Sequence, residues 1–459
     1  MSRHWITSYD AGVPQTINPD AYASVVDLLD TATRDYADLP AFACFGTQMT
    51  YGQLDEKSRA VAAYLQQKLG VKRGDRVALM CPNIFAFPVA MLGILRAGAT
   101  QVNDNPLYTP RELEHQLNDA GAETILIFAG STPTLSAIIE NTPIKTVVTI
   151  DLGDAIGLPI PTPPADPAIK DPIPFADVLT EGAHLTFDPV ALTGDDTLFF
   201  QYTGGTTGLS KGAVLTHRNL VANSEQFRAY LPEATEPAKE VVVGALPLYH
   251  IFGLTLSLCY MAIGAKIVLI PNPRDMDAFM AAIKDSKFSI MAGVNTLFAG
   301  LCMHPAFKEV DFSGYKVAIG GGAAVLQTTS EEWKSITGHH IKEGYGLSET
   351  SPILCINPMS VTHFTGACGL PVSSTDIKLL DDNDNEVAIG ERGEICAAGP
   401  QIMRGYWNRD DANEEVFTKD GYFRTGDIGV FDDQGYLRIV DRKKDMILVS
   451  GFNVYPNEV

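Results

Sequence analysis

A glycine-rich segment, Tyr202–Gly212, combines an adaptable backbone with many hydrogen-bond donors. Its four glycines let several backbone N–H groups approach one point, and three threonines, a serine and a lysine add side-chain donors. A polyphosphate is held by donors of this kind. The segment follows a predicted strand, Leu198–Gln201, and precedes a second apolar run, Ala213–Leu215. The pattern therefore predicts a phosphate-binding loop.

Two other chemistries share parts of this segment. A P-loop NTPase needs a serine or threonine directly after its lysine, but Gly212 follows Lys211, and no helix is expected there. The esterase pattern Gly-x-Ser-x-Gly matches Gly208–Gly212, yet Ser210 lies inside a long loop and not at a strand-to-helix turn. A plain glycine-rich turn would not need so many hydroxyls. A serine hydrolase stays a third-ranked alternative.

Three further motifs follow the Thr203–Lys211 loop, at Gly344–Thr350, Tyr422–Asp427 and Asp441–Asp445. In order and spacing, the four motifs resemble the superfamily of acyl-CoA synthetases, luciferases and peptide-synthetase adenylation domains. From Asn103 to Glu458, nearly the whole chain is similar to bacterial long-chain fatty-acid–CoA ligases in particular.

This resemblance implies a reaction in two steps. A fatty-acid carboxylate attacks the α-phosphorus of ATP and expels pyrophosphate, and coenzyme A then converts the acyl-adenylate into a thioester and AMP. Two anions must be aligned and their charge neutralised, which suits Mg²⁺ held by hard oxygen ligands. The resemblance implies Glu349 as a metal ligand, together with the hydroxyl of Thr203, either directly or through water. The implied catalytic residues are Thr203, Lys211, His250 and Glu349.

The resemblance also assigns nucleotide contacts. Thr350 is expected at the α-phosphate, Tyr345 on adenine, and Asp427 on the ribose hydroxyls with Arg442 beside it. Lys211 is either solvated or accompanies the departing pyrophosphate. The full expected ATP- and AMP-binding set is Tyr202, Thr203, Gly204, Gly205, Thr206, Thr207, Gly208, Lys211, Gly321, Gly322, Ala323, Glu343, Gly344, Tyr345, Gly346, Thr350, Asp427 and Arg442.

The acid substrate is expected near His250, a histidine within an apolar run. A lone histidine in such a run is often a satisfied core residue, but the resemblance places it beside the reacting carboxylate. No Asp or Glu lies between Ala245 and Ala265, whereas an amino-acid-activating site would need one to hold an ammonium group. The expected acyl pocket comprises Tyr249, His250, Gly253, Val294, Asn295, Thr296 and Phe298.

Composition restricts the partners and the compartment. The formal net charge of −21 opposes binding to nucleic acid. Seven scattered cysteines without a Cys-x-x-Cys pair fit a reducing cytoplasm. The first ten residues lack the apolar core of a signal peptide. The uncharged run Val241–Ala265 is interrupted by Pro247 and Gly253, so its ends are interpreted as separate short strands. Transient contact with the inner face of the cytoplasmic membrane and a homodimer stay open.

The elements that must position these residues are predicted as α/β. Apolar runs such as Arg76–Met80, Thr124–Phe128 and Thr146–Ile150 alternate with helix-length segments such as Ile84–Arg96. This rhythm is typical of doubly wound sheets, and the number of runs predicts two such subdomains. The proline-rich stretch Ile156–Pro174 is predicted as a surface loop.

After about residue 365 the pattern changes to strands without long helices between them. The strands are predicted at Thr375–Asp381, Gly393–Ala398, Ile428–Asp432 and Tyr436–Val440. We therefore expect a small antiparallel, barrel-like subdomain over about 365–440. Residues 1–440 would form one large N-terminal domain, and 441–459 a hinge at Lys444 and the start of a truncated C-terminal domain.

Other activities stay open at this point. A medium-chain, aryl or acyl-carrier-linked ligase would carry the same motifs. The alternative from a different class is a nucleotide- and fatty-acid-binding module with little turnover. The resemblance places an adenylation-assisting lysine in the C-terminal domain, which is expected to be truncated in this chain.

Overall fold

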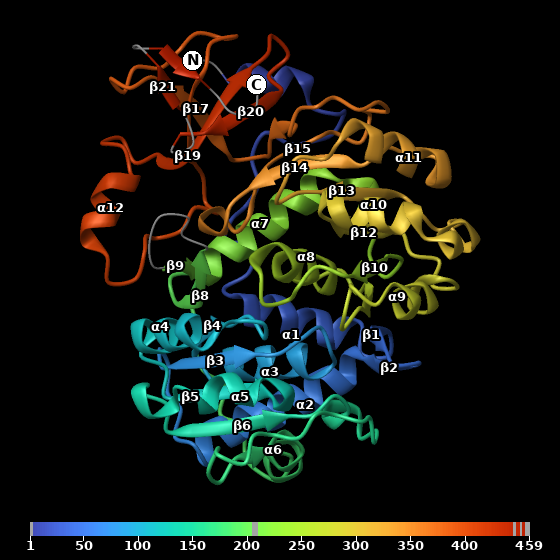
Figure 1. The fold of residues 1–459 in the computed structure, drawn as a ribbon, viewed down its shortest axis with the longest axis vertical. Coiled ribbons are helices and arrows are strands. Elements are labelled where there is room, and N and C mark those ends of the chain that lie inside the picture. Colours follow the sequence, from blue (N-terminus) through green and yellow to red (C-terminus); the bar gives the residue numbers. More distant parts are fainter. Residues whose placement is uncertain (1–2, 204–209, 444–446, 450–451, 455–459) are drawn as a thin grey trace.

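The computed structural model describes residues 3–203, 210–443, 447–449 and 452–454. Figure 1 shows three sheets along the long axis of the molecule: a seven-stranded sheet at the bottom, a nine-stranded sheet in the middle and a four-stranded sheet at the top. A two-stranded sheet joins β21 (Ile447–Val449) and β22 (Phe452–Val454). The two large sheets and the small antiparallel sheet confirm the predicted α/β class with three subdomains.

The seven-stranded sheet has the order β7-β6-β5-β3-β4-β8-β9 and is parallel except for its last strand. Its strands are β3 (Arg76–Met80), β4 (Thr100–Asn103), β5 (Thr124–Phe128), β6 (Thr146–Ile150), β7 (Ile173–Pro174), β8 (Thr197–Thr203) and β9 (Lys211–Thr216). The proline-rich stretch runs as a connection up to β7, where Pro174 lies on an edge strand. That position suits proline because it has no N–H to donate.

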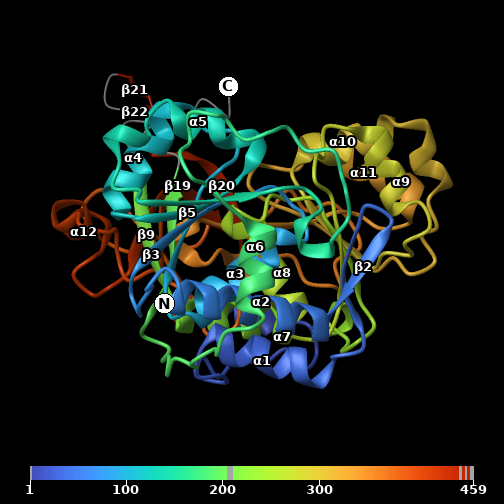
Figure 2. The same ribbon diagram turned by 90° about the horizontal axis from the view of Figure 1, so that it is seen from below.

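Helices cover both faces of this sheet, as Figure 2 shows from below. Side chains alternate along each strand, so Val77 and Leu79 face one helix layer while Ala78 and Met80 face the other. One layer contains α2 (Tyr51–Gln67), α3 (Ala86–Arg96) and α6 (Phe175–Gly182), and the other contains α4 (Pro110–Ala120) and α5 (Thr132–Ser136).

The nine-stranded sheet has the order β16-β15-β14-β13-β12-β10-β11-β1-β2. Its strands are β1 (Pro40–Cys44), β2 (Thr47–Thr50), β10 (Val241–Gly244), β11 (Lys266–Leu269), β12 (Ile290–Gly293), β13 (Val317–Gly320), β14 (Lys342–Gly346), β15 (Ile353–Ile356) and β16 (Leu370–Pro371). The centre is parallel, and both ends are antiparallel. Helices α9 (Met276–Ile283), α10 (Asn295–Met303) and α11 (Gln327–Thr337) cover its outer face.

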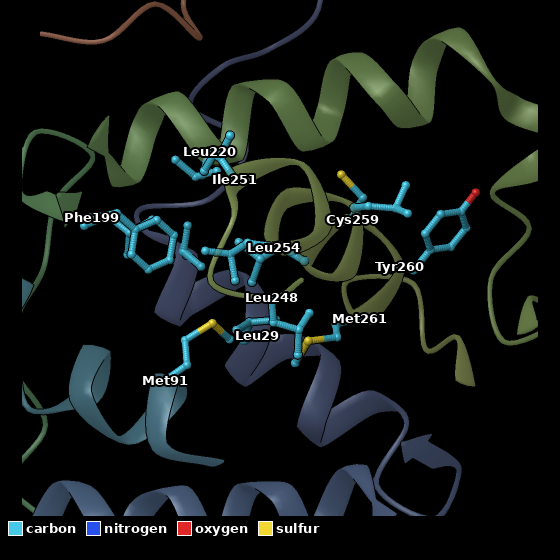
Figure 3. Packing of buried hydrophobic residues seen from close by; sticks show 14 of the residues in the cluster. Leu29, Met91, Phe199, Leu220, Leu248, Ile251, Leu254, Cys259, Tyr260 and Met261 are labelled. Atoms are coloured by element: carbon cyan, nitrogen blue, oxygen red, sulfur yellow. The ribbon is translucent and has the colours of Figure 1, made fainter. Parts of the chain in front are cut away.

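A shared helix layer fills the space between the two large sheets, formed by α1 (Val25–Asp35), α7 (His217–Tyr230) and α8 (Ile251–Met261) together with α2 and α3. Figure 3 shows Leu254 and Leu248 packed between Leu220 of α7, Leu29 of α1 and Met91 of α3. Because α8 is surrounded by protein, it is apolar on all sides.

This helix corrects one expectation. The uncharged run Val241–Ala265 is not a pair of short strands, since its first part is β10 and its second part is α8. Within the described ranges, every helix is too short or too polar to cross a membrane.

The small sheet is antiparallel throughout, in the order β17-β18-β19-β20. Its strands are β17 (Asp376–Leu380), β18 (Gly393–Ala398), β19 (Phe423–Phe431) and β20 (Leu437–Arg442), and α12 (Asp410–Val416) lies between β18 and β19. Among the described residues this sheet is open, so the barrel-like closure we expected is absent. A short helical turn, η1 (His4–Ser8), packs against it instead, with Trp5 stacked on Phe431 at 5.5 Å between ring centroids.

Candidate functional site

One cavity of about 960 Å³ gathers residues from all three subdomains. β8, β13 and β14 contribute residues at or near their carboxyl ends, which are the usual ligand site of such sheets, and β19 and β20 of the small sheet add Asp427 and Arg442. The sequence-predicted residues that line it are Tyr202, Thr203, Lys211, Tyr249, His250, Gly321, Gly322, Gly344, Tyr345, Gly346, Glu349, Asp427 and Arg442.

The predicted phosphate loop connects two antiparallel strands, with Thr203 of β8 paired to Lys211 of β9. Gly204, Gly205, Thr206, Thr207 and Gly208 lie outside the described residues. Ser210 leads directly into β9, and its carbonyl accepts a hydrogen bond of 2.7 Å from His115 Nε2. Strand β9, and not a helix, begins directly after Ser210, so the strand-to-helix turn of an esterase elbow is not present at Ser210 and a serine hydrolase does not fit.

Glu349 lies in a short helical turn, η7 (Ser348–Thr350), immediately after β14. Its side chain is buried, and Tyr406 Oη donates a hydrogen bond of 2.6 Å to Glu349 Oε1. Burial raises the pKa of Glu349, while the Tyr406 hydrogen bond and the charge of Lys211 oppose that rise. The carboxylate is therefore held at the cavity wall, near a lysine and a hydroxyl.

The neighbouring Thr350 is placed differently from expectation. It is fully buried and does not line the cavity. Its hydroxyl accepts a hydrogen bond from the Leu347 N–H at 2.9 Å. The same hydroxyl is the hydrogen-bond donor to the carbonyls of Leu347 and Pro352. In this structure Thr350 shapes the turn that carries Glu349.

The residues at this wall fit a magnesium ion. Glu349 and the Thr203 hydroxyl are hard oxygen donors, and both line the cavity. In the described part of the chain, no group of three or more His, Cys, Asp and Glu residues gathers as a protein-only metal site. Magnesium at phosphate-binding sites commonly takes one or two protein ligands and completes its shell with phosphate oxygens and water, so this donor set suits a metal that arrives with ATP.

Asp427 and Arg442 face each other across the small sheet, in register on β19 and β20. Arg442 Nε lies 3.7 Å from Asp427 Oδ1, and Tyr345 Oη donates to Asp427 Oδ2 at 2.7 Å. Tyr345 belongs to β14 of the nine-stranded sheet, so this hydrogen bond joins two subdomains at the cavity. A carboxylate held in this way can accept hydrogen bonds from a ribose diol.

The turn after β13 forms another wall. Gly321 and Gly322 line the cavity, whereas Ala323 does not. A Cβ on Gly321 would approach the Phe252 ring to 3.0 Å, and Gly322 has a φ of +75°. Glu343 lies behind this wall, where its carboxylate accepts backbone hydrogen bonds from Val325 and Gly366, and burial raises its pKa to about 7.

At the expected acyl end, Tyr249 and His250 line the cavity. His250 Nδ1 accepts a hydrogen bond of 3.3 Å from the Phe252 N–H at the start of α8. The surrounding protein lowers the pKa of His250, which keeps the imidazole neutral near pH 7.

The other five predicted pocket residues do not line the cavity. A Cβ on Gly253 would meet the carbonyl oxygens of Pro247 and Leu246 at 2.5 and 2.8 Å, so this glycine allows close backbone packing. Asn295 Oδ1 accepts from the Leu326 N–H at 2.9 Å. Phe298 is fully buried and packs edge-on against Trp333. The remaining two are Val294, which is half-buried, and Thr296, which is exposed.

Several cavity residues escaped the sequence reasoning. Lys443 follows the predicted Arg442, and the expected hinge residue Lys444 lies outside the described residues. Others lie outside the four motifs, and they include Asn105, Tyr108, Gln201, Phe252, Ile353, Ile356 and Tyr406. The similarity that begins at Asn103 includes the segment of Asn105 and Tyr108, but no local pattern marked Tyr406.

Comparisons with known proteins agree with this geometry. Residues 29–407 match the AMP-binding enzyme family. A long-chain-fatty-acid–CoA ligase of Salmonella typhimurium is 49% identical over 100% of this chain and 84% of its own length, and one of Escherichia coli O157:H7 is 48% identical with the same coverage.

A crystal structure of an anthranilate CoA ligase in complex with anthranoyl-AMP superposes with a TM-score of 0.86, covering 96% of this chain and 83% of that one. At 23% identity this likeness concerns the fold alone. The family match covers most of the chain, and the identities extend along all of it. The chain therefore belongs to the AMP-binding enzyme family.

Proposed function

We propose that this chain uses ATP to activate a long-chain fatty acid, first to an acyl-adenylate with release of pyrophosphate and then to acyl-CoA with release of AMP. One observation carries the proposal: a single cavity is lined both by the charged groups Lys211, Glu349 and Asp427 and by apolar side chains next to His250. The relatives at 43–49% identity, named long-chain-fatty-acid–CoA ligases, support the substrate class.

The first step brings together two anions, so catalysis depends on alignment and on charge neutralisation. Asp427 would hold the ribose and fix the position of the α-phosphorus. Lys211 would lie along the phosphates and stabilise the charge that develops on the leaving pyrophosphate. Mg²⁺, when bound by Glu349 and the Thr203 hydroxyl, supplies further positive charge to the phosphate oxygens.

The carboxylate of the acid would enter beside His250. Because the imidazole is neutral, it can donate a hydrogen bond to one carboxylate oxygen without neutralising the nucleophile, which leaves the other oxygen free to attack phosphorus. Phe252, Ile353 and Ile356 supply apolar cavity wall for an alkyl chain. No Asp or Glu lies between Ala245 and Ala265 to attract an ammonium group.

The proposal includes an arrangement of the whole protein. Residues 1–440 would bind ATP and the acid, and 441–459 would act as a hinge at Lys444. Coenzyme A would react at the same cavity in the second step. All seven cysteines are free and buried, which suits the cytoplasmic location that we propose.

The test measures AMP and pyrophosphate with a panel of acids of graded chain length, with and without coenzyme A. AMP release that requires a long-chain acid, and thioester that requires coenzyme A, are the expected results. A preference for aryl or medium-chain acids would overturn the long-chain assignment. Ester hydrolysis without ATP, or the absence of acid-dependent AMP, would overturn acid activation itself.

A further inference from the structure

The segment Met403–Trp407 contacts the proposed metal-binding carboxylate with both backbone and side chain. The Met403 N–H donates to the Glu349 carbonyl at 2.7 Å, and Tyr406 Oη donates to Glu349 Oε1 at 2.6 Å. Glu349 is thus held at two points by a segment that lies more than fifty residues further along the chain.

Tyr406 also contacts the lysine of the phosphate loop. Lys211 Nζ lies 5.1 Å from the centroid of the Tyr406 ring, at the distance of a cation–π interaction. Glu349, Tyr406 and Lys211 all line the cavity. One aromatic side chain therefore contacts both charged groups expected around the phosphates, donating to the acid with its hydroxyl and facing the lysine with its ring.

The segment itself is held firmly. It adds to the edge of β9, where the Val214 N–H donates to the Gly405 carbonyl at 2.9 Å and the Trp407 N–H donates to the Gly212 carbonyl at 2.9 Å. The Asn413 side chain completes the turn, accepting from the Tyr406 N–H at 2.7 Å and donating to its carbonyl at 2.9 Å.

A second anchor lies on the far side of the same segment. Trp407 Nε1 donates to the carbonyl of Asp119 at 3.1 Å, and Arg409 pairs with the Asp119 carboxylate at 2.5 Å. Tyr202, beside the phosphate loop, donates to the other Asp119 oxygen at 2.8 Å. Helix α4, the phosphate-loop hairpin and the Tyr406 segment are therefore fixed to one another, so the Tyr406 hydroxyl has little freedom to leave Glu349.

We infer that Tyr406 is a positioning residue that fixes the Glu349 carboxylate for the metal–ATP complex. The hydroxyl occupies Oε1 and would leave Oε2 available to a metal, while the ring contacts Lys211 and would restrain it for the phosphates. The inference rests on the proposed function, because it assigns Tyr406 a part in ATP binding at the same cavity. A hydrogen bond to a charged group contributes enough binding free energy that its loss should weaken metal-dependent ATP binding about tenfold.

The test uses Tyr406→Phe, which removes only the hydroxyl and keeps the ring under Lys211. Calorimetry measures ATP affinity with Mg²⁺ and with the metal chelated, and AMP affinity alongside. We expect the gain in ATP affinity on adding Mg²⁺ to fall about tenfold, with AMP affinity and metal-free ATP affinity unchanged.

The chain offers a matched control in Tyr422. Its hydroxyl also donates to a carboxylate, Asp376 Oδ2 at 3.1 Å, and Lys378 Nζ lies 4.0 Å from its ring, but it does not line the cavity. Tyr422→Phe therefore shows how the loss of a tyrosine–carboxylate hydrogen bond outside the cavity affects ATP affinity. If Tyr406→Phe and Tyr422→Phe show the same response to Mg²⁺, Tyr406 does not position Glu349.

A double-mutant cycle with Glu349→Gln tests whether Tyr406 acts through the acid. If it does, Tyr406→Phe has no further effect on metal-dependent ATP binding once Glu349 is changed, whereas additive losses would overturn the inference. Wild-type ATP affinity that gains nothing from Mg²⁺ would also overturn it. If the binding pattern holds but no acid yields AMP, the proposed function fails while the role of Tyr406 stands.

Discussion

Glu349 is a buried carboxylate in the cavity wall, and we propose that its negative charge binds the metal. Glu349→Gln keeps the size of the side chain and can still accept from Tyr406, but it removes the charge that would hold a metal. We expect the rate of adenylate formation to fall by about a hundredfold or more while the fold is retained. Pyrophosphate release at saturating Mg²⁺ measures the rate, and thermal unfolding checks the fold. Wild-type activity in a folded Glu349→Gln protein would exclude Glu349 from the site.

At the scale of a helix, α8 connects the expected acyl end to the core, because it begins next to His250 and is buried along its length. Gly253, in its first turn, packs against the backbone of Leu246 and Pro247. In Gly253→Ala the added methyl group would push the His250 segment away, and we expect a loss of about 1–3 kcal/mol in the free energy of unfolding.

Gly300 of α10 is the matched control for that change. A Cβ there would make only an ordinary contact, 3.7 Å from Met276 Cε. Since alanine favours a helix over glycine, Gly300→Ala should leave stability unchanged or raise it by up to about 1 kcal/mol. Denaturant unfolding of both variants measures the difference. Equal stability of the two proteins would show that the space at Gly253 is not limiting.

Glu343, in β14 behind the wall formed by Gly321 and Gly322, makes the stability of the protein sensitive to pH. Its pKa is raised from 4.5 to about 7 in the folded protein, chiefly by burial, so the folded state binds its proton more tightly than the unfolded state does. The stability that the protonated group contributes is complete below about pH 4.5. It declines as pH rises towards 7 and then stays constant, a change on the order of 2–3 kcal/mol.

Glu343→Gln should remove this decline. We expect the stability of the wild type to fall relative to that of Glu343→Gln between pH 5 and 8, as measured by denaturant unfolding at several pH values. Glu332→Gln, on the exposed side of α11, serves as the control and should show the same pH dependence as the wild type. A parallel pH profile for Glu343→Gln and the wild type would contradict the assignment.

At the scale of the whole molecule, the cavity couples three sheets, because its walls come from β8 and β9, from β14, and from β19 and β20. A ligand that binds only the folded arrangement stabilises all three together, by about 2.7 kcal/mol at a concentration of 100 Kd. For a chain of this size we expect ATP, AMP or a long-chain fatty acid to raise the Tm by about 2–4 °C.

Asp427→Ala should abolish the rise with ATP and AMP and preserve the rise with the fatty acid, because Asp427 is expected to contact only the ribose. Thermal unfolding with each ligand alone gives the comparison. Loss of all three shifts in Asp427→Ala would mean that this residue supports the small sheet and not a ligand.

The sequence by itself determined the chemistry and the class of fold. Donor-rich glycine loops, motif order and the alternation of strands and helices are local properties, so they can be read before any contact is known. Together with the family resemblance, they led us to expect Thr203, Lys211, Glu349, Asp427 and most of the other motif residues at one site, and the structure brings them to one cavity.

Only the tertiary structure decided which side chains the chain brings to that site from elsewhere. Tyr406 reaches Glu349 because its segment adds to β9, and Trp5 reaches Phe431 across almost the whole sequence. Phe298 was expected in the acyl pocket but is fully buried and packs edge-on against Trp333. The physical reason is that strand pairing and side-chain burial depend on contacts between residues far apart in the sequence. The spacing of neighbouring residues does not determine those contacts.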